Sequence, residues 1–203
     1  MPTNYGVSAR DYLARARFNL ASDQLPSLFY AAFELRCCVE ARQDLYLEAQ
    51  KKYRRSLPRS WQLKPKSREL DRIFASNQIV QLTVHHDDSL GSTFQYVPIS
   101  PSLLKAAQKL GDDLHCKQRH HDPSHPWWSE LRDRLVDTYR QAWFCCKGQL
   151  LCPLLINPGL KTEGVFDVDG LDPDFISSMR SGRILKLTVA YSTTYPSDWI
   201  CDL

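Results

Sequence analysis

The chain has 203 residues, of which 43% are hydrophobic, and a formal net charge of only +3. This length and composition suffice for one packed domain, which we expect to span residues 1–203. The small net charge excludes a protein held on nucleic acid or an anionic membrane by its overall field. No apolar run approaches the roughly 20 residues of a membrane span, and the N-terminus lacks the order of a signal peptide. We therefore expect a cytoplasmic protein with no membrane partner.

The cysteines and the missing motifs narrow the chemistry. Seven cysteines are an odd number, and two pairs are adjacent, Cys37-Cys38 and Cys145-Cys146. Neither feature fits a disulfide framework, and no CxxC motif is present, so we interpret the cysteines as buried free thiols. The sequence also lacks a phosphate-binding loop and the GxGxxG, GxSxG and HExxH motifs. These absences argue against nucleotide hydrolysis and dinucleotide chemistry, and we expect no cofactor.

Two helices are predicted at the start of the chain. Ser8 and Asp11 have the spacing of a capping box, and the apolar period that follows predicts a helix over about 8–22. A second helix is predicted from near Pro26 to about Arg55. Its two neighbouring apolar stripes indicate that it packs against several neighbours at once. The two helices should form a hairpin.

Strand-like segments occupy the middle and the tail. After a short helix at Ser67–Ala75, the segments Gln78–His85 and Thr93–Ile99 alternate around a turn-rich stretch and predict a β-hairpin. Near the C-terminus, Glu163–Val168 and Arg183–Tyr191 form a second pair of predicted strands. The pattern does not decide whether the two pairs meet in one sheet.

Two more helices flank the stretch CKQRHHDPSHPWW. Ser100-Pro101 has the order of a helix start and predicts a helix to about Gln118, on which His115 should lie beside a helix contact. A further helix is predicted over about Trp127 to Leu151. The sequence therefore predicts an α+β protein, a mainly helical four-helix bundle that carries a small antiparallel sheet.

Potential metal ligands gather between these two helices. They are His115, Cys116, His120, His121, Asp122 and His125. Their spacing is not a recognised zinc pattern, and the sequence offers no second ligand cluster. Metal binding through the cluster from His115 to His125 is one alternative function.

The same stretch suits chemistry on a phosphate. Arg119 precedes His125 by six positions, and His120 follows the arginine directly. Arginine offers a permanent charge and a planar fork that matches a phosphate, and histidine moves protons at physiological pH. Together they could cleave RNA without a metal: the 2′-hydroxyl attacks the adjacent phosphorus, histidine transfers protons and arginine stabilises the growing negative charge.

This arrangement resembles the motif of HEPN-domain ribonucleases, in which an arginine is followed by a polar residue and then, after four to six intervening residues, by a histidine. Residues 8–55 resemble the first two helices of such a domain, and residues 100–152 the later pair. The resemblance implies a metal-independent ribonuclease that forms a homodimer, with two motifs facing one cleft. Arg119 would be the phosphate ligand, His125 the acid/base and His120 its polar companion. It also implies a toxin or antiviral effector that a partner protein, such as an antitoxin, restrains.

A protein-interaction or regulatory module is the other alternative. Many HEPN domains are not catalytic. In that interpretation the stretch is a polar loop whose Trp127 and Trp128 anchor the following helix rather than stack on bases. An unpaired strand edge at Arg183–Tyr191 could then receive a partner.

Overall fold

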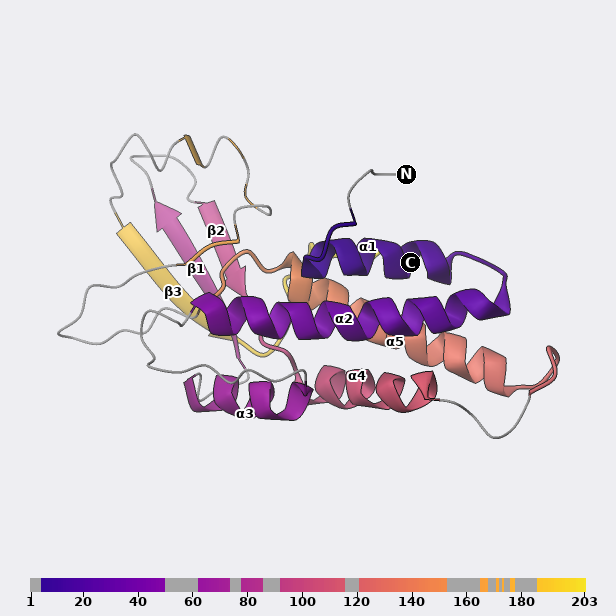
Figure 1. Cartoon of the computed structure of the whole chain (residues 1–203). Coiled ribbons are helices and arrows are strands. Elements are labelled where there is room, and N and C mark those ends of the chain that lie inside the picture. The colour runs from indigo at the N-terminus through magenta and orange to yellow at the C-terminus, as the bar shows by residue number, and fades with distance from the viewer. Residues whose placement is uncertain are drawn as a thin grey trace.

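The computed structural model describes residues 5–49, 62–73, 78–85, 92–115, 121–152, 165–167, 171, 173, 176–177 and 186–203. A bundle of helices carries a three-stranded antiparallel sheet at one end (Figure 1). The described elements are α1 (Ala9–Leu20), α2 (Leu25–Ala49), α3 (Leu63–Ile73), β1 (Ile79–His85), β2 (Ser92–Tyr96), α4 (Pro101–Leu114), α5 (Trp127–Lys147) and β3 (Lys186–Ser192). This architecture confirms the predicted α+β fold class.

The hairpin of α1 and α2 forms as predicted. The Ser8 hydroxyl accepts a hydrogen bond from the amide of Asp11 at 3.1 Å, and the Asp11 carboxylate accepts one from the amide of Ser8 at 3.1 Å. The capping box thus satisfies amides that have no partner inside the helix. At the other end of α1, the Arg132 guanidinium of α5 donates to the carbonyl of Leu20 at 2.8 Å and ties the hairpin to the bundle.

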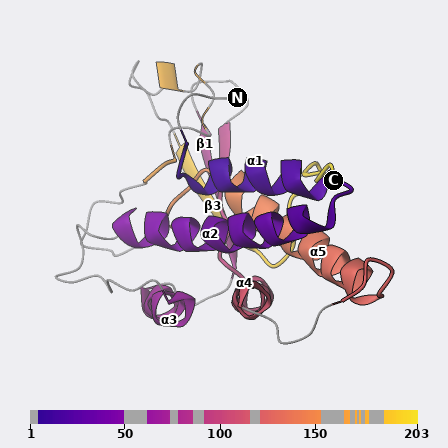
Figure 2. The same cartoon turned by 45° about the vertical axis from the view of Figure 1, so that its right-hand side comes forward.

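The second helix, α2, is the centre of the bundle. It packs against α1, α3, α4 and α5, as its two apolar stripes predicted. Figures 1 and 2 both show α2 between α1 on one side and α3 and α4 on the other. Leu28, Leu35 and Tyr46 on this helix are fully buried. The predicted extension from residue 50 to Arg55 lies outside the described residues.

The sheet has the strand order β2-β1-β3, and both pairings are antiparallel. Val80, Leu82 and Val84 alternate along β1 and are buried on one face. The predicted hairpin of β1 and β2 is confirmed, and β3 joins it at β1. The predicted strand Glu163–Val168 is described only at residues 165–167, where Phe166 forms an isolated bridge with Leu150 and not with β3.

Three helix ends differ from their predicted positions. The third helix begins at Leu63 rather than Ser67. Helix α4 ends at Leu114, four residues early, because His115 takes an extended conformation (φ −71°, ψ 151°). His115 is exposed there, so the prediction that it lies beside a helix contact is wrong. Helix α5 ends at Lys147 because Gly148 is extended, and two residues later the amide of Leu150 donates to the carbonyl of Gln95 on β2.

A buried polar cluster joins the bundle to the segment after α5. Arg42 of α2 is 1% exposed, and its guanidinium donates to Asp167 at 3.1 Å and to the carbonyl of Gly148 at 2.7 Å. Beside it, the sulfur atoms of Cys38 and Cys146 lie 3.6 Å apart. The six cysteines within the described residues are free thiols, and four of them are buried, in accord with the sequence.

Candidate functional site

The loop between α4 and α5 contains the predicted site, and the structure describes its second half. Arg119 and His120 lie outside the described residues. His121 is half-buried and His125 is exposed to solvent. Of the three residues predicted to be catalytic, the structure therefore describes only His125, two residues before α5 begins.

The two prolines around His125 shape an ordered turn. Pro123 follows Asp122 and occupies the second position of a β-turn, where its fixed φ is favourable. The amide of His125 closes the turn by donating to the carbonyl of Asp122 at 2.9 Å. The indole Nε1 of Trp128 donates to the same carbonyl at 3.1 Å. Pro126 then occupies the N-cap position of α5, without a side-chain capping hydrogen bond.

One ring nitrogen of His125 is already engaged. The amide of Trp127, the first residue of α5, donates to Nδ1 of His125 at 3.1 Å. This amide is one of those that a helix N-terminus leaves without an internal partner. Because Nδ1 accepts a hydrogen bond, the neutral imidazole carries its proton on Nε2. In this state His125 offers a hydrogen-bond donor to solvent.

His121 supplies a second imidazole at this site. Its ring lies 4.6 Å from that of His125, and it stacks on the indole of Trp127 at 4.8 Å with only 12° between the planes. The sequence marked His121 as a potential metal ligand but did not indicate that it is a companion of His125. Their spacing of four was the available signal, but the β-turn between them, not a helix, brings the rings together.

The tryptophans anchor the start of α5 to α2. The ring of Phe29 on α2 lies 6.1 Å from Trp127 and 5.7 Å from Trp128, the latter edge to face. Both tryptophans are half-buried and pack against the hydrophobic core. This contact agrees with their predicted role as anchors. It also holds the His121 ring, through its stack on Trp127, in one place.

The described residues do not provide a set of ligands for the alternative function, metal binding. In that part of the chain, no group of three His, Cys, Asp or Glu side chains is arranged to hold a metal ion. Cys116 and His120, two of the proposed ligands, lie outside it. His121 and His125 are adjacent, but two imidazoles alone fall short of the four ligands of a structural zinc site.

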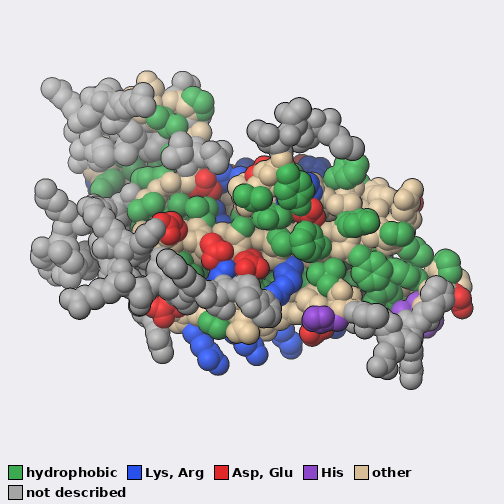
Figure 3. All heavy atoms as spheres, viewed as in Figure 1, with side chains coloured by type: hydrophobic (Ala, Val, Ile, Leu, Met, Phe, Trp, Pro, Cys, Tyr) green, Lys and Arg blue, Asp and Glu red, His purple; other side chains and the backbone are tan. Residues whose placement is uncertain are grey.

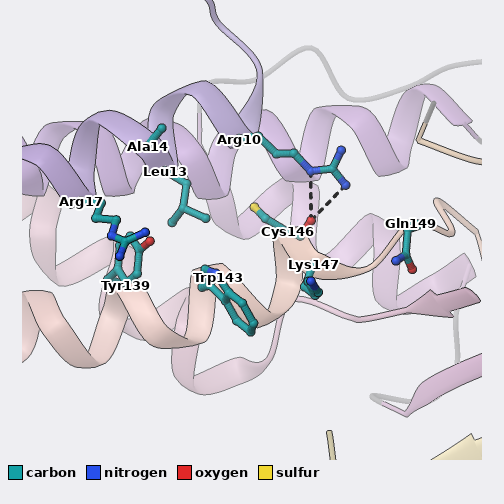
Figure 4. A pocket seen from close by; sticks show the side chains of 9 residues that line it. All are labelled: Arg10, Leu13, Ala14, Arg17, Tyr139, Trp143, Cys146, Lys147 and Gln149. Atoms are coloured by element: carbon teal, nitrogen blue, oxygen red, sulfur yellow. Dashed lines mark hydrogen bonds between the residues drawn. The ribbon is translucent and has the colours of Figure 1, made fainter. Parts of the chain in front are cut away.

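A cavity that the sequence analysis missed lies between α1 and α5, at the far end of α5 (Figure 4). Its volume is about 390 Å³, and the residues that line it include Arg10, Arg17, Trp143 and Lys147. The sequence signal was the helical spacing of the two arginines, and of Tyr139, Trp143 and Lys147. That spacing identifies two helix faces, but it does not show that they face each other.

A comparison with family models, curated proteins and solved structures finds no match. Among the described helices, none has both the length and the hydropathy that a membrane-spanning segment requires.

Proposed function

We propose that the chain is a HEPN-like, metal-independent ribonuclease that acts through the loop between α4 and α5. The proposal includes a homodimer and, as the resemblance implies, a toxin or antiviral role under the control of a partner protein. The observation that carries it is an exposed imidazole, His125, fixed at the start of α5 with the imidazole of His121 4.6 Å away. Two adjacent imidazoles can divide the base and acid roles of RNA cleavage.

The chemistry assigned to the loop requires no group from outside the protein. The 2′-hydroxyl of the RNA loses its proton to one imidazole and attacks the adjacent phosphorus. The bond from phosphorus to the 5′-oxygen breaks, and the second imidazole protonates that oxygen. Arg119 binds the phosphoryl oxygens and stabilises their charge, and His120 is the polar companion. The products are a 2′,3′-cyclic phosphate and a 5′-hydroxyl.

The bond between Trp127 and His125 sets a condition on this cycle. A protonated imidazole has a hydrogen on both nitrogens, so Nδ1 cannot accept from the Trp127 amide in that state. His125 must therefore release this amide when it gains a second proton. Breaking a hydrogen bond of this kind costs about 1 kcal/mol net. This cost is small enough for the proton-transfer step to proceed. His121, whose ring stacks on Trp127, needs no such release.

The arrangement of the helices supports the proposal. The hairpin of α1 and α2 packs on α5, α4 packs on α2 and on α5, and the candidate loop joins α4 to α5. The resemblance implies this order, with the Arg/His motif between the later two helices. The strands lie at the opposite end of α2 from the loop, so they do not cover it (Figure 1).

The test is cleavage of labelled single-stranded RNA by the purified full chain in EDTA. The His125→Asn variant is the sharpest, because its amide oxygen can still accept from Trp127 while the side chain cannot transfer protons. We expect it and Arg119→Ala to lose at least about 100-fold in rate, the scale of a missing acid or base. The product ends should carry a 2′,3′-cyclic phosphate.

His85→Ala is the matched control, since His85 lies on β1 in the sheet. It should cleave like the original chain. Cleavage that survives in both His125→Asn and Arg119→Ala, or an original chain that cuts no RNA, would disprove the ribonuclease proposal.

An interaction module is the second candidate, and an exposed apolar surface favours it. Phe18 of α1 is 77% exposed, and Tyr30 and Phe33 of α2 are 63% and 48% exposed. Figure 3 shows hydrophobic side chains gathered over this part of α1 and α2. A chain that cuts no RNA, together with a change in oligomeric state when Tyr30 and Phe33 become serine, would support this function instead.

A further inference from the structure

The cavity between α1 and α5 is formed by one face of each helix. The α1 side of the cavity consists of four residues whose spacing places their side chains on one helical face: Arg10, Leu13, Ala14 and Arg17. The α5 side consists of four residues that are likewise three or four positions apart: Tyr139, Trp143, Cys146 and Lys147, the last two of which are adjacent. Figure 4 shows Arg17 beside Tyr139 at one end, Arg10 with Lys147 near the other, and Trp143 between them.

The space exists because a small side chain separates two long ones. Ala14 extends only a methyl group between Arg10 and Arg17, so α1 leaves open space at the middle of the cavity. Leu13, which is buried, and the indole of Trp143 supply apolar surface there. A volume of about 390 Å³ falls within the range of small-molecule sites.

The charge of the lining is positive and only partly compensated. Arg10 forms an ion pair with Asp167 at 3.1 Å and donates to the carbonyl of Cys146 at 3.2 Å. Asp167 also pairs with Arg42, so one carboxylate serves two guanidinium groups. Within the described part of the chain, neither Arg17 nor Lys147 forms an ion pair. All the lining residues are described, and none of them is acidic.

A buried thiol, Cys146, also lines the cavity. The hydrogen bond with Cys38 is the largest cause that holds the pKa of Cys146 below its usual value, against the opposing effect of burial. The guanidinium groups of Arg42 and Arg10 lower that pKa further.

We propose that this cavity binds a small organic anion, a phosphate monoester whose apolar body lies against Leu13 and Trp143. Arg17 holds the phosphate, because its guanidinium forms no ion pair in the described structure and its fork matches phosphate oxygens. Lys147, whose ammonium lies 5.6 Å from the centre of the Trp143 ring, adds attraction from the other end. The site does not depend on the proposed ribonuclease, since the α5 residues that line it lie about 20 to 30 Å along the helix from the catalytic loop.

Isothermal titration calorimetry of the full chain with phenyl phosphate tests the site. We expect saturable binding with a dissociation constant of about 1 mM or tighter, and weaker binding of inorganic phosphate, which lacks the apolar body. Arg17→Ala should weaken binding of phenyl phosphate about tenfold or more, the effect of losing a charged hydrogen bond.

Two further variants separate a site from general attraction. Ala14→Met preserves the charge but fills the cavity, and it should abolish binding of phenyl phosphate. Lys64→Ala removes an exposed cation from α3 and should leave binding unchanged. Absence of binding in the original chain, full affinity in Ala14→Met, or equal losses in Lys64→Ala and Arg17→Ala would each overturn the proposal.

Discussion

At the N-terminus of α1, two side chains decide where the helix begins. The Ser8 hydroxyl accepts from the amide of Asp11, and it also donates to the Asp11 carboxylate at 2.6 Å. The Ser8 side chain is the largest cause that lowers the pKa of Asp11, and the Ser8 amide adds to it. The box is local in sequence, which is why its spacing alone could identify it.

Ser8→Ala should lower the free energy of unfolding by about 1 kcal/mol at neutral pH, because it removes the N-cap acceptor. Since folding depresses the pKa of Asp11, its contribution is present above the unfolded pKa of about 3.9 and is lost as pH falls through the lower folded value. Urea denaturation at pH 7 and at pH 2.5 to 3 measures the difference, which should shrink in acid.

Ser129→Ala is the control for this box. Ser129 lies in the first turn of α5, and its hydroxyl donates to the carbonyl of Pro126 rather than accepting from an amide. The variant should be nearly neutral at both pH values. Equal stability of Ser8→Ala and the original chain at neutral pH would show that the box contributes nothing.

Elements were predictable from the sequence where the signal is local. Periodicity and the caps at Ser8 and Ser100 located the helices of the bundle and the starts of α1 and α4. The helix ends were less predictable, because tertiary contacts set them: α5 ends just before Leu150 bonds to β2. The same limit applies to the candidate site, where the sequence identified His125 but not the turn that brings His121 to it.

Arg42 shows what local signals leave out. The residue lies inside α2, on a surface that periodicity describes as core, and its partner Asp167 is 125 positions away. Nothing in the sequence near either residue indicates the pairing. The cavity between α1 and α5 was missed for the same reason, since its two faces become a pocket only when the helices are packed.

Arg42→Ala should lower the free energy of unfolding by about 3 to 5 kcal/mol, the usual effect of breaking a buried ion pair. The loss also leaves the carbonyl of Gly148 without its guanidinium donor. Chemical denaturation measures the effect. Arg140→Ala is the matched control, because Arg140 is exposed and pairs with an exposed Asp137, so its removal should change stability by less than about 1 kcal/mol.

Similar stability of the two arginine variants would mean that Arg42 is solvated in the folded protein. It would also weaken the description of the cavity, because Arg10, which lines the cavity, shares Asp167 with Arg42.

The whole molecule is held together where the bundle meets the sheet. The amide of Leu150 donates to the carbonyl of Gln95 on β2 at 2.9 Å, and Arg42 binds the carbonyl of Gly148 just before it. The sheet itself combines the chain's middle with its C-terminal strand. Alternation in the sequence predicted the strands, but it could not name the partner of β3, because a strand pattern specifies a face and not a neighbour.

Gly148→Ala should destabilise the protein through this junction. A Cβ at Gly148 would lie 2.9 Å from the carbonyl oxygen of Gln95 and 3.2 Å from the Val97 side chain, and the first of these atoms is backbone. The φ of −62° suits alanine, so the effect is steric and not conformational. We expect a loss of about 1 to 3 kcal/mol in the free energy of unfolding, as in other overpacked sites.

Gly111→Ala provides a control of opposite sign. Gly111 lies inside α4, and a Cβ there would meet the Arg36 guanidinium at 3.5 Å, an ordinary contact. Because alanine is the better helix former, this variant should stabilise the protein by about 0.5 to 1 kcal/mol. Urea denaturation of both variants separates the two effects: if Gly148→Ala also stabilised the chain, the strand β2 would not lie against the end of α5, and the junction of bundle and sheet would be wrong.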